Sequence, residues 1–281
     1  MYPAIVAWLK NGTLPWLALL VPKPGVLYAV VLLVCGALFV RRVTRSGLDA
    51  DRALEALLAA AVGALVGTRL FYLVTRTRFW ELSLPQLIDA RQGTASWGAY
   101  LGAFLGLILY AQWRKYRVLT LTDAATSAGP LACVIGRWNC LLAGDDFGRV
   151  TTWWWGIRYP AGSLPWNAHR RSGLIGPEAT WSLPVHPNQI VQSLVSLAVF
   201  IIVSVYWYRN RQVPGRTTSM FLVLYGAARF VVEFLRDPAA GGADGLLSHS
   251  QYMCLVFIVS GAVLWWWQRR ASVTQPAHGP A

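Results

Sequence analysis

The sequence predicts an all-α fold: a polytopic transmembrane protein with about seven spanning helices. Hydrophobic residues make up 56% of the 281 residues and charged residues only 13%, whereas an ordinary soluble domain is about 25% charged. The apolar residues also gather in runs close to the roughly 20 residues that a helix needs to cross the hydrocarbon core of a bilayer. A soluble fold of this length has too little interior to bury so much apolar surface.

Seven apolar runs are expected to form the spans. They cover residues 24–40, 53–74, 96–113, 119–142, 187–207, 219–235 and 251–267. A short interfacial helix is expected around Trp16. The N-terminus lacks a positively charged start followed by an A-x-A-type cleavage site, so we expect the first run to remain as a membrane helix. The whole is predicted to be one transmembrane domain over 1–270, followed by a polar, disordered tail over 271–281.

Short basic clusters predict the orientation. Twelve of the lysines and arginines lie in four brief segments after the first, third, fifth and seventh runs, at 41–52, 114–117, 209–216 and 269–270. Ten more are spread over the longer segments of the opposite side. Because the denser basic side faces the cytoplasm, the N-terminus is expected outside and the C-terminus inside, in a bacterial cytoplasmic (inner) membrane.

The longest segment between spans, 144–186, is expected to be a non-helical loop on the outer side. It holds five tryptophans, which are enriched where a protein meets lipid headgroups. The alternatives are an ordinary outer loop with an aromatic belt and a cap over a site below it. The tryptophans are Trp153, Trp154, Trp155, Trp166 and Trp181.

Two classes of function are disfavoured by composition. The net charge of +13 comes from clusters that orient helices and meet anionic headgroups, with no basic helix typical of nucleic-acid binding. The four cysteines lie inside apolar runs without metal-ligand spacing. We therefore expect the lipid bilayer as a partner, and no nucleic acid, no metal and no cofactor.

Arg137 and Arg229 are the strongest candidates for chemistry. An arginine within a membrane helix costs at least a few kcal/mol at mid-depth, so it must face a partner, water or a lipid phosphate. A guanidinium group matches a phosphate with two parallel hydrogen bonds. The alternative is a structural ion pair, since Glu233 follows Arg229 by one turn. Arg69, near a helix end, is expected to extend toward the membrane surface.

Polar residues gather at two helix ends. The first group runs from Gly136 to Arg149, where Asp145 or Asp146 is expected either to act as a base or to pair with Arg149; a plain helix-end turn with a surface ion pair is the alternative. The second group opens the fifth run with His186-Pro187-Asn188-Gln189 and includes Gln192. This group is interpreted as the polar wall of a site, although proline also fits an ordinary helix start.

In this order, these motifs resemble the prolipoprotein diacylglyceryl transferase family over nearly the whole chain. The resemblance rests on the Gly136-Arg137 segment ending in Gly148-Arg149, on His186-Pro187-x-Gln189, and on Arg229-Phe230-x-x-Glu233-Phe234-x-Arg236-x-Pro238. Weaker support comes from Gly25-x-x-Tyr28 followed by Arg41-Arg42, and from Ser248-x-x-Gln251.

The resemblance implies transfer of a diacylglyceryl group from phosphatidylglycerol to the lipobox cysteine of prolipoprotein signal peptides. It implies that Arg137 and Arg229 are catalytic and act on the phosphate, because cations that follow the charge of a leaving phosphate lower the barrier. The substrate-binding residues are then expected to be Tyr28, Asp145, Asp146, Gly148, Arg149, His186, Gln189, Glu233 and Arg236.

The chain departs from the family pattern at several polar positions. Gly98 stands where the family has a histidine, Pro24 where it has a tyrosine, and Ala239 where it has an acid; Asn139-Cys140 replaces a Gly-Asn pair. These changes concern proton transfer more than lipid binding. A thiol with a pKa near 8.5 needs a base or a positive site, and the candidates are Asp145, Asp146, His186 or no base.

Three hypotheses follow from the sequence. The first is the diacylglyceryl transferase itself. The second is a phospholipid-dependent transferase of the same fold with a different acceptor. The third is a non-catalytic protein that binds or transports an anionic lipid, although no internal repeat of the kind common in transporters is present.

Overall fold

The structure, a computed structural model, describes residues 26–76, 96–243 and 245–273. Its described part is helical apart from isolated β-bridges, so the predicted all-α class is confirmed. The expected helix around Trp16, the Pro24 position and the tail from residue 274 onward lie outside these residues. The elements are α3 (Val26–Arg45), α4 (Ala50–Arg76), α6 (Ser96–Trp113), α7 (Val118–Ala143), α8 (Leu164–Arg171), α9 (Asn188–Asn210), α10 (Arg216–Glu233), η3 (Pro238–Ala240) and α11 (His249–Val273).

Each of the seven predicted spans coincides with a helix. Five of these helices, α3, α4, α7, α9 and α11, are long and apolar enough to cross a membrane. Helices α6 and α10 have 18 residues each, and α10 carries Arg216, Arg229 and Glu233. That these two also span remains a prediction. Apolar side chains such as Leu33, at 71% exposure, point outward along the helices, as expected where lipid replaces water.

The chain divides into two compact units. We call Gly36–Thr126 with Trp207–Thr218 the glycine unit. The remaining described residues, which include most of α7, α9, α10 and α11, form the arginine unit. That residues 1–270 act as one transmembrane domain remains a prediction.

In the glycine unit, α4 and α6 approach each other along glycines. A Cβ atom added to Gly67, Gly98 or Gly102 would collide with the backbone of the facing helix. Small residues allow membrane helices to pack at this distance. Gly98, the position compared above with a family histidine, therefore serves helix packing.

Two further contacts hold the glycine unit. The Asp123 carboxylate accepts hydrogen bonds from the backbone N–H groups of Gly215 and Thr218, both at 2.7 Å, and so caps the start of α10. The guanidinium of Arg42, buried to 2% exposure, lies over the ring of Trp207. Arg69 is also buried and lies over the ring of Tyr72, so its expected extension to the membrane surface is not observed.

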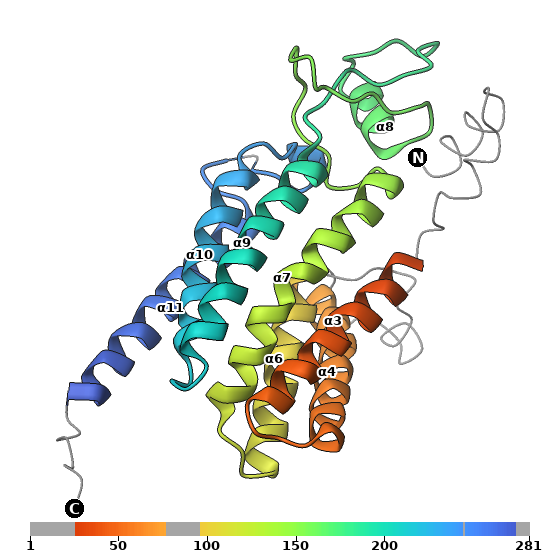
Figure 1. Cartoon of the computed structure of the whole chain (residues 1–281). Coiled ribbons are helices and arrows are strands. Elements are labelled where there is room, and N and C mark those ends of the chain that lie inside the picture. Colours follow the sequence, from red (N-terminus) through yellow and green to blue (C-terminus); the bar gives the residue numbers. More distant parts are fainter. Residues whose placement is uncertain (1–25, 77–95, 244, 274–281) are drawn as a thin grey trace, which may run out of the picture. The chain divides into compact units, whose positions relative to one another are not determined.

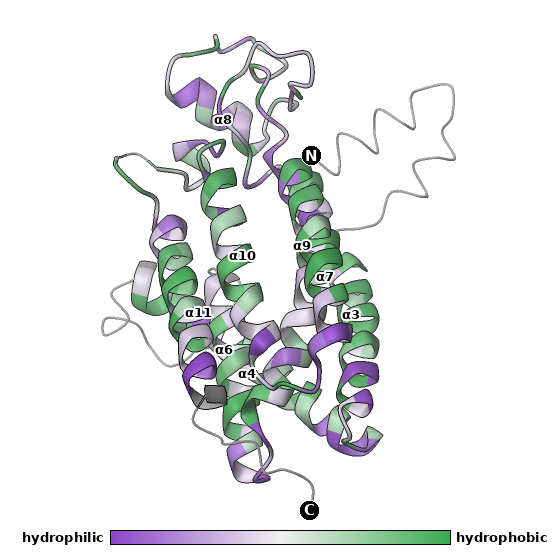
Figure 2. Ribbon diagram, turned by 60° about the vertical axis from the view of Figure 1, so that its left-hand side comes forward, coloured by the Kyte–Doolittle hydropathy of each residue, from purple (hydrophilic) through white to green (hydrophobic). Residues whose placement is uncertain are grey.

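In the arginine unit, α9 runs beside the second half of α7 (Figure 1). Glycines again bring two helices together, because a Cβ at Gly226 would meet the backbone of Cys254 and one at Gly261 the backbone of Ser219. The helices are mostly hydrophobic along their length, while the segment around α8 is more hydrophilic (Figure 2).

The segment 144–186 corrects one prediction, because it contains a helix. Ser163 caps the N-terminus of α8 by accepting a hydrogen bond from the backbone of Trp166, and Pro165 stands in its first turn, where proline is favourable. With eight residues the helix is too short to show a clear period. The segment folds around a buried cluster of Phe147, Tyr159 and Val185.

Candidate active site

Backbone contacts in the arginine unit bring three segments together at the ends of α7, α9 and α10. The Gly148 N–H donates to His186 O at 3.1 Å, and the Arg149 N–H donates to Leu235 O at 2.8 Å. A Cβ at Gly148 would meet the His186 carbonyl at 2.5 Å, so glycine is required there. The turn that leads to it contains Asp146, with φ of 53°, a conformation uncommon for a residue other than glycine.

Five charged side chains from α7, α10 and this turn form one continuous network. Arg137 pairs with Asp146, which also pairs with Arg236. Arg236 contacts Glu233 at 3.2 Å, and Glu233 pairs with Arg229. Arg229 and Glu233 are almost fully buried, at 7% and 1% exposure. The network places three guanidinium groups beside apolar helices, where they can bind an anionic ligand.

The structure settles two sequence-based alternatives for these residues. The ion pair of Arg229 with Glu233, one turn apart, is present. The expected pairing of Arg149 with Asp145 or Asp146 is wrong: Arg149 is exposed and its side chain donates to the Ala243 carbonyl at 3.3 Å. Asp146 pairs with Arg137 instead because the chain reverses after Gly144, whose φ is 78°.

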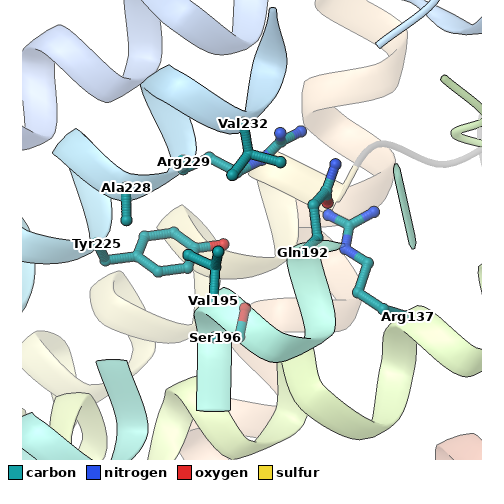
Figure 3. Close-up of a pocket in the computed structure, with 8 residues that line it drawn as sticks. All are labelled: Arg137, Gln192, Val195, Ser196, Tyr225, Ala228, Arg229 and Val232. Carbon is teal, nitrogen blue, oxygen red and sulfur yellow. The ribbon is translucent and has the colours of Figure 1, made fainter. Parts of the chain in front are cut away.

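Arg137 and Arg229 line one pocket despite their carboxylate partners. It is bounded by α7, α9 and α10, and Figure 3 shows Gln192 of α9 between the two guanidinium-bearing side chains. Its empty space, about 250 Å³, includes its opening to the outside. The lining residues are Arg137, Gln192, Val195, Ser196, Tyr225, Ala228, Arg229 and Val232. A pocket with two guanidinium groups and apolar walls suits a phosphate that carries alkyl substituents.

The two aspartates of the turn have opposite electrostatic environments. Burial raises the pKa of Asp145 to about 6, and the nearby charge of Asp146 adds to this rise. Burial acts on Asp146 in the same direction, but the guanidinium groups of Arg236 and Arg137 outweigh it and hold the pKa of Asp146 below its ordinary value. Asp145 is therefore the better proton acceptor of the two near neutral pH.

Asp145 also has free hydrogen-bonding capacity. The Cys140 thiol lies beside its carboxyl group and 3.9 Å from Nη1 of Arg137. The Oδ1 atom of Asp145 is buried without a hydrogen-bond partner among the described residues. A carboxylate oxygen in this state is available to a ligand.

The predicted polar wall at the start of α9 supports the turn. Gln189 Nε2 donates to the Asp145 carbonyl at 2.5 Å and to the Tyr159 hydroxyl at 3.1 Å. The Asn188 amide donates to the Asp146 carbonyl at 3.1 Å. His186 Nδ1 accepts a hydrogen bond from the Trp155 indole at 3.0 Å. These side chains hold the aspartates in place, and of the polar wall only Gln192 reaches the pocket.

Tyr28, near the start of α3, lies in the same region, next to the side chain of Asn139. Several residues of the site were not among those predicted, and two of them carry polar groups next to predicted residues. Cys140 sits beside Asp145, and Tyr225 lines the pocket four residues before Arg229. The spacing of Tyr225 and Arg229, one helical turn, was the available signal.

Cys140, Asp145 and Asp146 also place a sulfur and two carboxylate oxygens within 4.8 Å of one another. Metal ions bind such donors. Here both oxygens of Asp146 already pair with arginines, and the positive charge of those arginines opposes a cation. These ion pairs and the neighbouring positive charge disfavour a metal ion at this set.

Comparison with known proteins gives one consistent result. A family model described as prolipoprotein diacylglyceryl transferase matches residues 19–267. The phosphatidylglycerol–prolipoprotein diacylglyceryl transferase 2 of Clostridium perfringens is 32% identical over 238 residues, which cover 83% of this chain and 86% of that protein. The transferase of Paracidovorax citrulli is 32% identical over 80% of this chain and 77% of its own length, and that of Thermotoga petrophila is 29% identical over 79% and 72%. The chain belongs to the prolipoprotein diacylglyceryl transferase family.

Proposed function

We propose that this protein transfers the diacylglyceryl group of phosphatidylglycerol to the cysteine thiol of prolipoprotein signal peptides. The observation that carries the proposal is the pocket shared by Arg137 and Arg229. In the reaction the thiol sulfur attacks the carbon of the diacylated glycerol that is bonded to a phosphate oxygen. A carbon–sulfur bond forms, the carbon–oxygen bond breaks, and glycerol phosphate leaves with the electron pair.

The two arginines would bind the phosphodiester and stabilise the charge that grows on the leaving phosphate. Both are held by carboxylates, Asp146 and Glu233, which fix the guanidinium groups before the substrate enters. Preorganised donors of this kind stabilise a transition state without reorganisation during the reaction. Arg236 bridges the two carboxylates and would therefore fix the position of Arg137 relative to Arg229.

Asp145 is our candidate for the base that removes the thiol proton. Its pKa of about 6 lies closer to the pKa of a thiol, near 8.5, than that of an ordinary aspartate. Its carboxyl group also lies beside a thiol, that of Cys140, and this proximity supports a role next to sulfur. Asp146, paired with two arginines, is less suited to this role.

We also propose a location in the bacterial cytoplasmic membrane, with the N-terminus outside and the C-terminus inside. The segment around α8 then faces outward and the four basic clusters face the cytoplasm. The prolipoprotein would meet the site from the side of the segment 144–186, where the turn carrying Asp145 lies.

The test is transfer by the purified protein from radiolabelled phosphatidylglycerol to a lipobox peptide. Arg137→Ala should abolish transfer, because the phosphate loses one of its two guanidinium partners. Arg171→Ala, which removes an exposed arginine of the same unit, is the matched control and should keep activity. Equal activity of Arg137→Ala and the control would contradict the role of the pocket.

A transferase with the same donor and a different acceptor is the second candidate. It is favoured by Gly98, since the position of the family's histidine is closed by α4 in this chain. Rescue of a strain depleted of its own transferase separates the two: rescue supports the prolipoprotein acceptor, whereas phosphatidylglycerol consumption without rescue supports another acceptor.

A further inference from the structure

Gln192 is a buried amide without a partner. Its exposure is 3%, and neither Nε2 nor Oε1 has a hydrogen-bond partner among the described residues. By contrast, Gln189, one turn earlier on α9, donates two hydrogen bonds with its Nε2, and only its Oε1 lacks a partner among the described residues. A buried polar group left unpaired is destabilising, because it has given up its hydrogen bonds to water. A side chain with both amide atoms in this state is typical of a site that a ligand completes.

The position of the Gln192 amide defines which part of a ligand it meets. It projects into the pocket between the Arg137 and Arg229 side chains (Figure 3). A ligand phosphate held by the two guanidinium groups would therefore bring its substituents next to this amide. Val195 and Val232 line the same pocket and offer no hydrogen bonds.

The chemistry of the amide narrows the ligand group further. Guanidinium groups only donate hydrogen bonds, whereas an amide donates through Nε2 and accepts through Oε1. A hydroxyl group also donates and accepts, so it can satisfy the amide. An ammonium headgroup cannot accept, and it would be repelled by the two arginines.

We propose that Gln192 is a specificity-determining residue that binds a hydroxyl of the donor's glycerol headgroup, on the far side of the phosphate. This inference rests on the proposed function, since it assigns the donor subsite of the same pocket. It explains why the pocket carries a neutral amide beside two cations. The arginines bind the phosphate, and the amide binds a hydroxyl of the headgroup attached to that phosphate.

The experiment compares two donors that differ only in the headgroup hydroxyls, phosphatidylglycerol and phosphatidylpropanol. The full-length protein is assayed in vesicles of phosphatidylcholine containing one donor, with a lipobox peptide as acceptor. The wild type should prefer phosphatidylglycerol by about tenfold, the effect of roughly one to two hydrogen bonds. Gln192→Leu should lower transfer from phosphatidylglycerol by a similar factor and leave transfer from phosphatidylpropanol unchanged.

Two further variants and one further readout make the result decisive. Leu194→Met alters an exposed residue of the same helix and should keep the donor preference. Gln192→Met, which retains an unbranched side chain, replaces Gln192→Leu if the latter does not fold. The rise in melting temperature caused by each donor is measured in parallel, so that recognition is tested without turnover.

Several outcomes would overturn the inference. One is an equal loss with both donors, since it assigns Gln192 to pocket structure or to the phosphate. Another is a wild type that does not discriminate between the donors in transfer or in melting temperature, and a third is a variant that changes only the KM for the peptide. If no transfer occurs but phosphatidylglycerol alone stabilises the wild type and not Gln192→Leu, the proposed function fails and the headgroup assignment stands.

Discussion

The glycine unit and the arginine unit both hold charged side chains among apolar helices, but the hydrogen-bond partners of the polar groups differ between the units. In the glycine unit, one oxygen of Glu55 accepts hydrogen bonds from Tyr110 at 2.9 Å and Arg114 at 2.7 Å. In the arginine unit, the network around the pocket leaves the Gln192 amide and Oδ1 of Asp145 without partners among the described residues.

The difference shows what distinguishes a site from a structural ion pair. An arginine in a membrane helix needs a partner, and each unit provides partners for its own arginines. Burial and charge are therefore common to both. In the arginine unit a pocket lies next to the charges, and the Gln192 amide that lines it lacks a partner among the described residues. These two features together, rather than the arginine alone, indicate a ligand.

Replacing one arginine by lysine in each unit tests this distinction. The replacement in the arginine unit should give the largest loss of activity. Arg229→Lys substitutes a point charge for a planar fork and should lower kcat/KM by about a hundredfold, the loss typical of one preorganised donor. Arg114→Lys should keep kcat/KM, because its ion pair with Glu55 is partly exposed and exposed ion pairs contribute little to stability. Steady-state kinetics of the two variants makes the comparison.

The ratio of kcat/KM between Arg229→Lys and Arg114→Lys decides between the two interpretations. If Arg229→Lys is as active as Arg114→Lys, charge neutralisation alone explains both arginines, and the pocket does not require a fork. A loss in both variants accompanied by lower melting temperatures would instead indicate that both pairs are structural.

The free carboxylate oxygen of Asp145 should produce the next largest effect, seen as a pH dependence. Because the pKa of Asp145 is raised to about 6, the carboxylate that acts as base is present above this pH and lost below it. The activity of the wild type should fall as the pH decreases through about 6. Asp145→Asn should lower kcat by about a hundredfold, the typical contribution of a general base, and should remove this inflection. A variant that keeps the inflection would assign the titration to another group.

Much of the fold was predictable because membrane helices obey simple rules of length and hydropathy. The run predicted over 96–113 coincides with α6, and that over 119–142 differs from α7 by one residue at each end. The short helix α8 was not predicted, since it depends on its Ser163 cap and on packing around Phe147 more than on its own pattern. The division into two units depends on contacts distant in sequence, which hydropathy does not report.

Within the candidate site, residue types were predictable and partners were not. Arg137 and Arg229 stood out as charges in apolar runs, and the pair of Arg229 with Glu233 followed from their spacing. The pair of Arg137 with Asp146 required the chain to reverse at Gly144, with a left-handed backbone at Asp146 itself. The sequence shows the glycine but not which of two adjacent aspartates the reversal directs toward the arginine.

The smallest effect is expected for a substitution in the glycine unit, and it concerns the stability of the protein. Gly98→Ala places a methyl group against the Gly67 carbonyl and 2.5 Å from Phe71 Cβ, so α4 and α6 must separate slightly, at a cost of about 1–3 kcal/mol typical of overpacking. Gly129→Ala, where an added Cβ meets nothing within 4 Å, is the matched control and should leave the melting temperature unchanged or slightly raised. Thermal unfolding of both variants in detergent makes the measurement. A Gly98→Ala protein as stable as the control would mean that this position tolerates a side chain, and the family's histidine position would then be open in this chain after all.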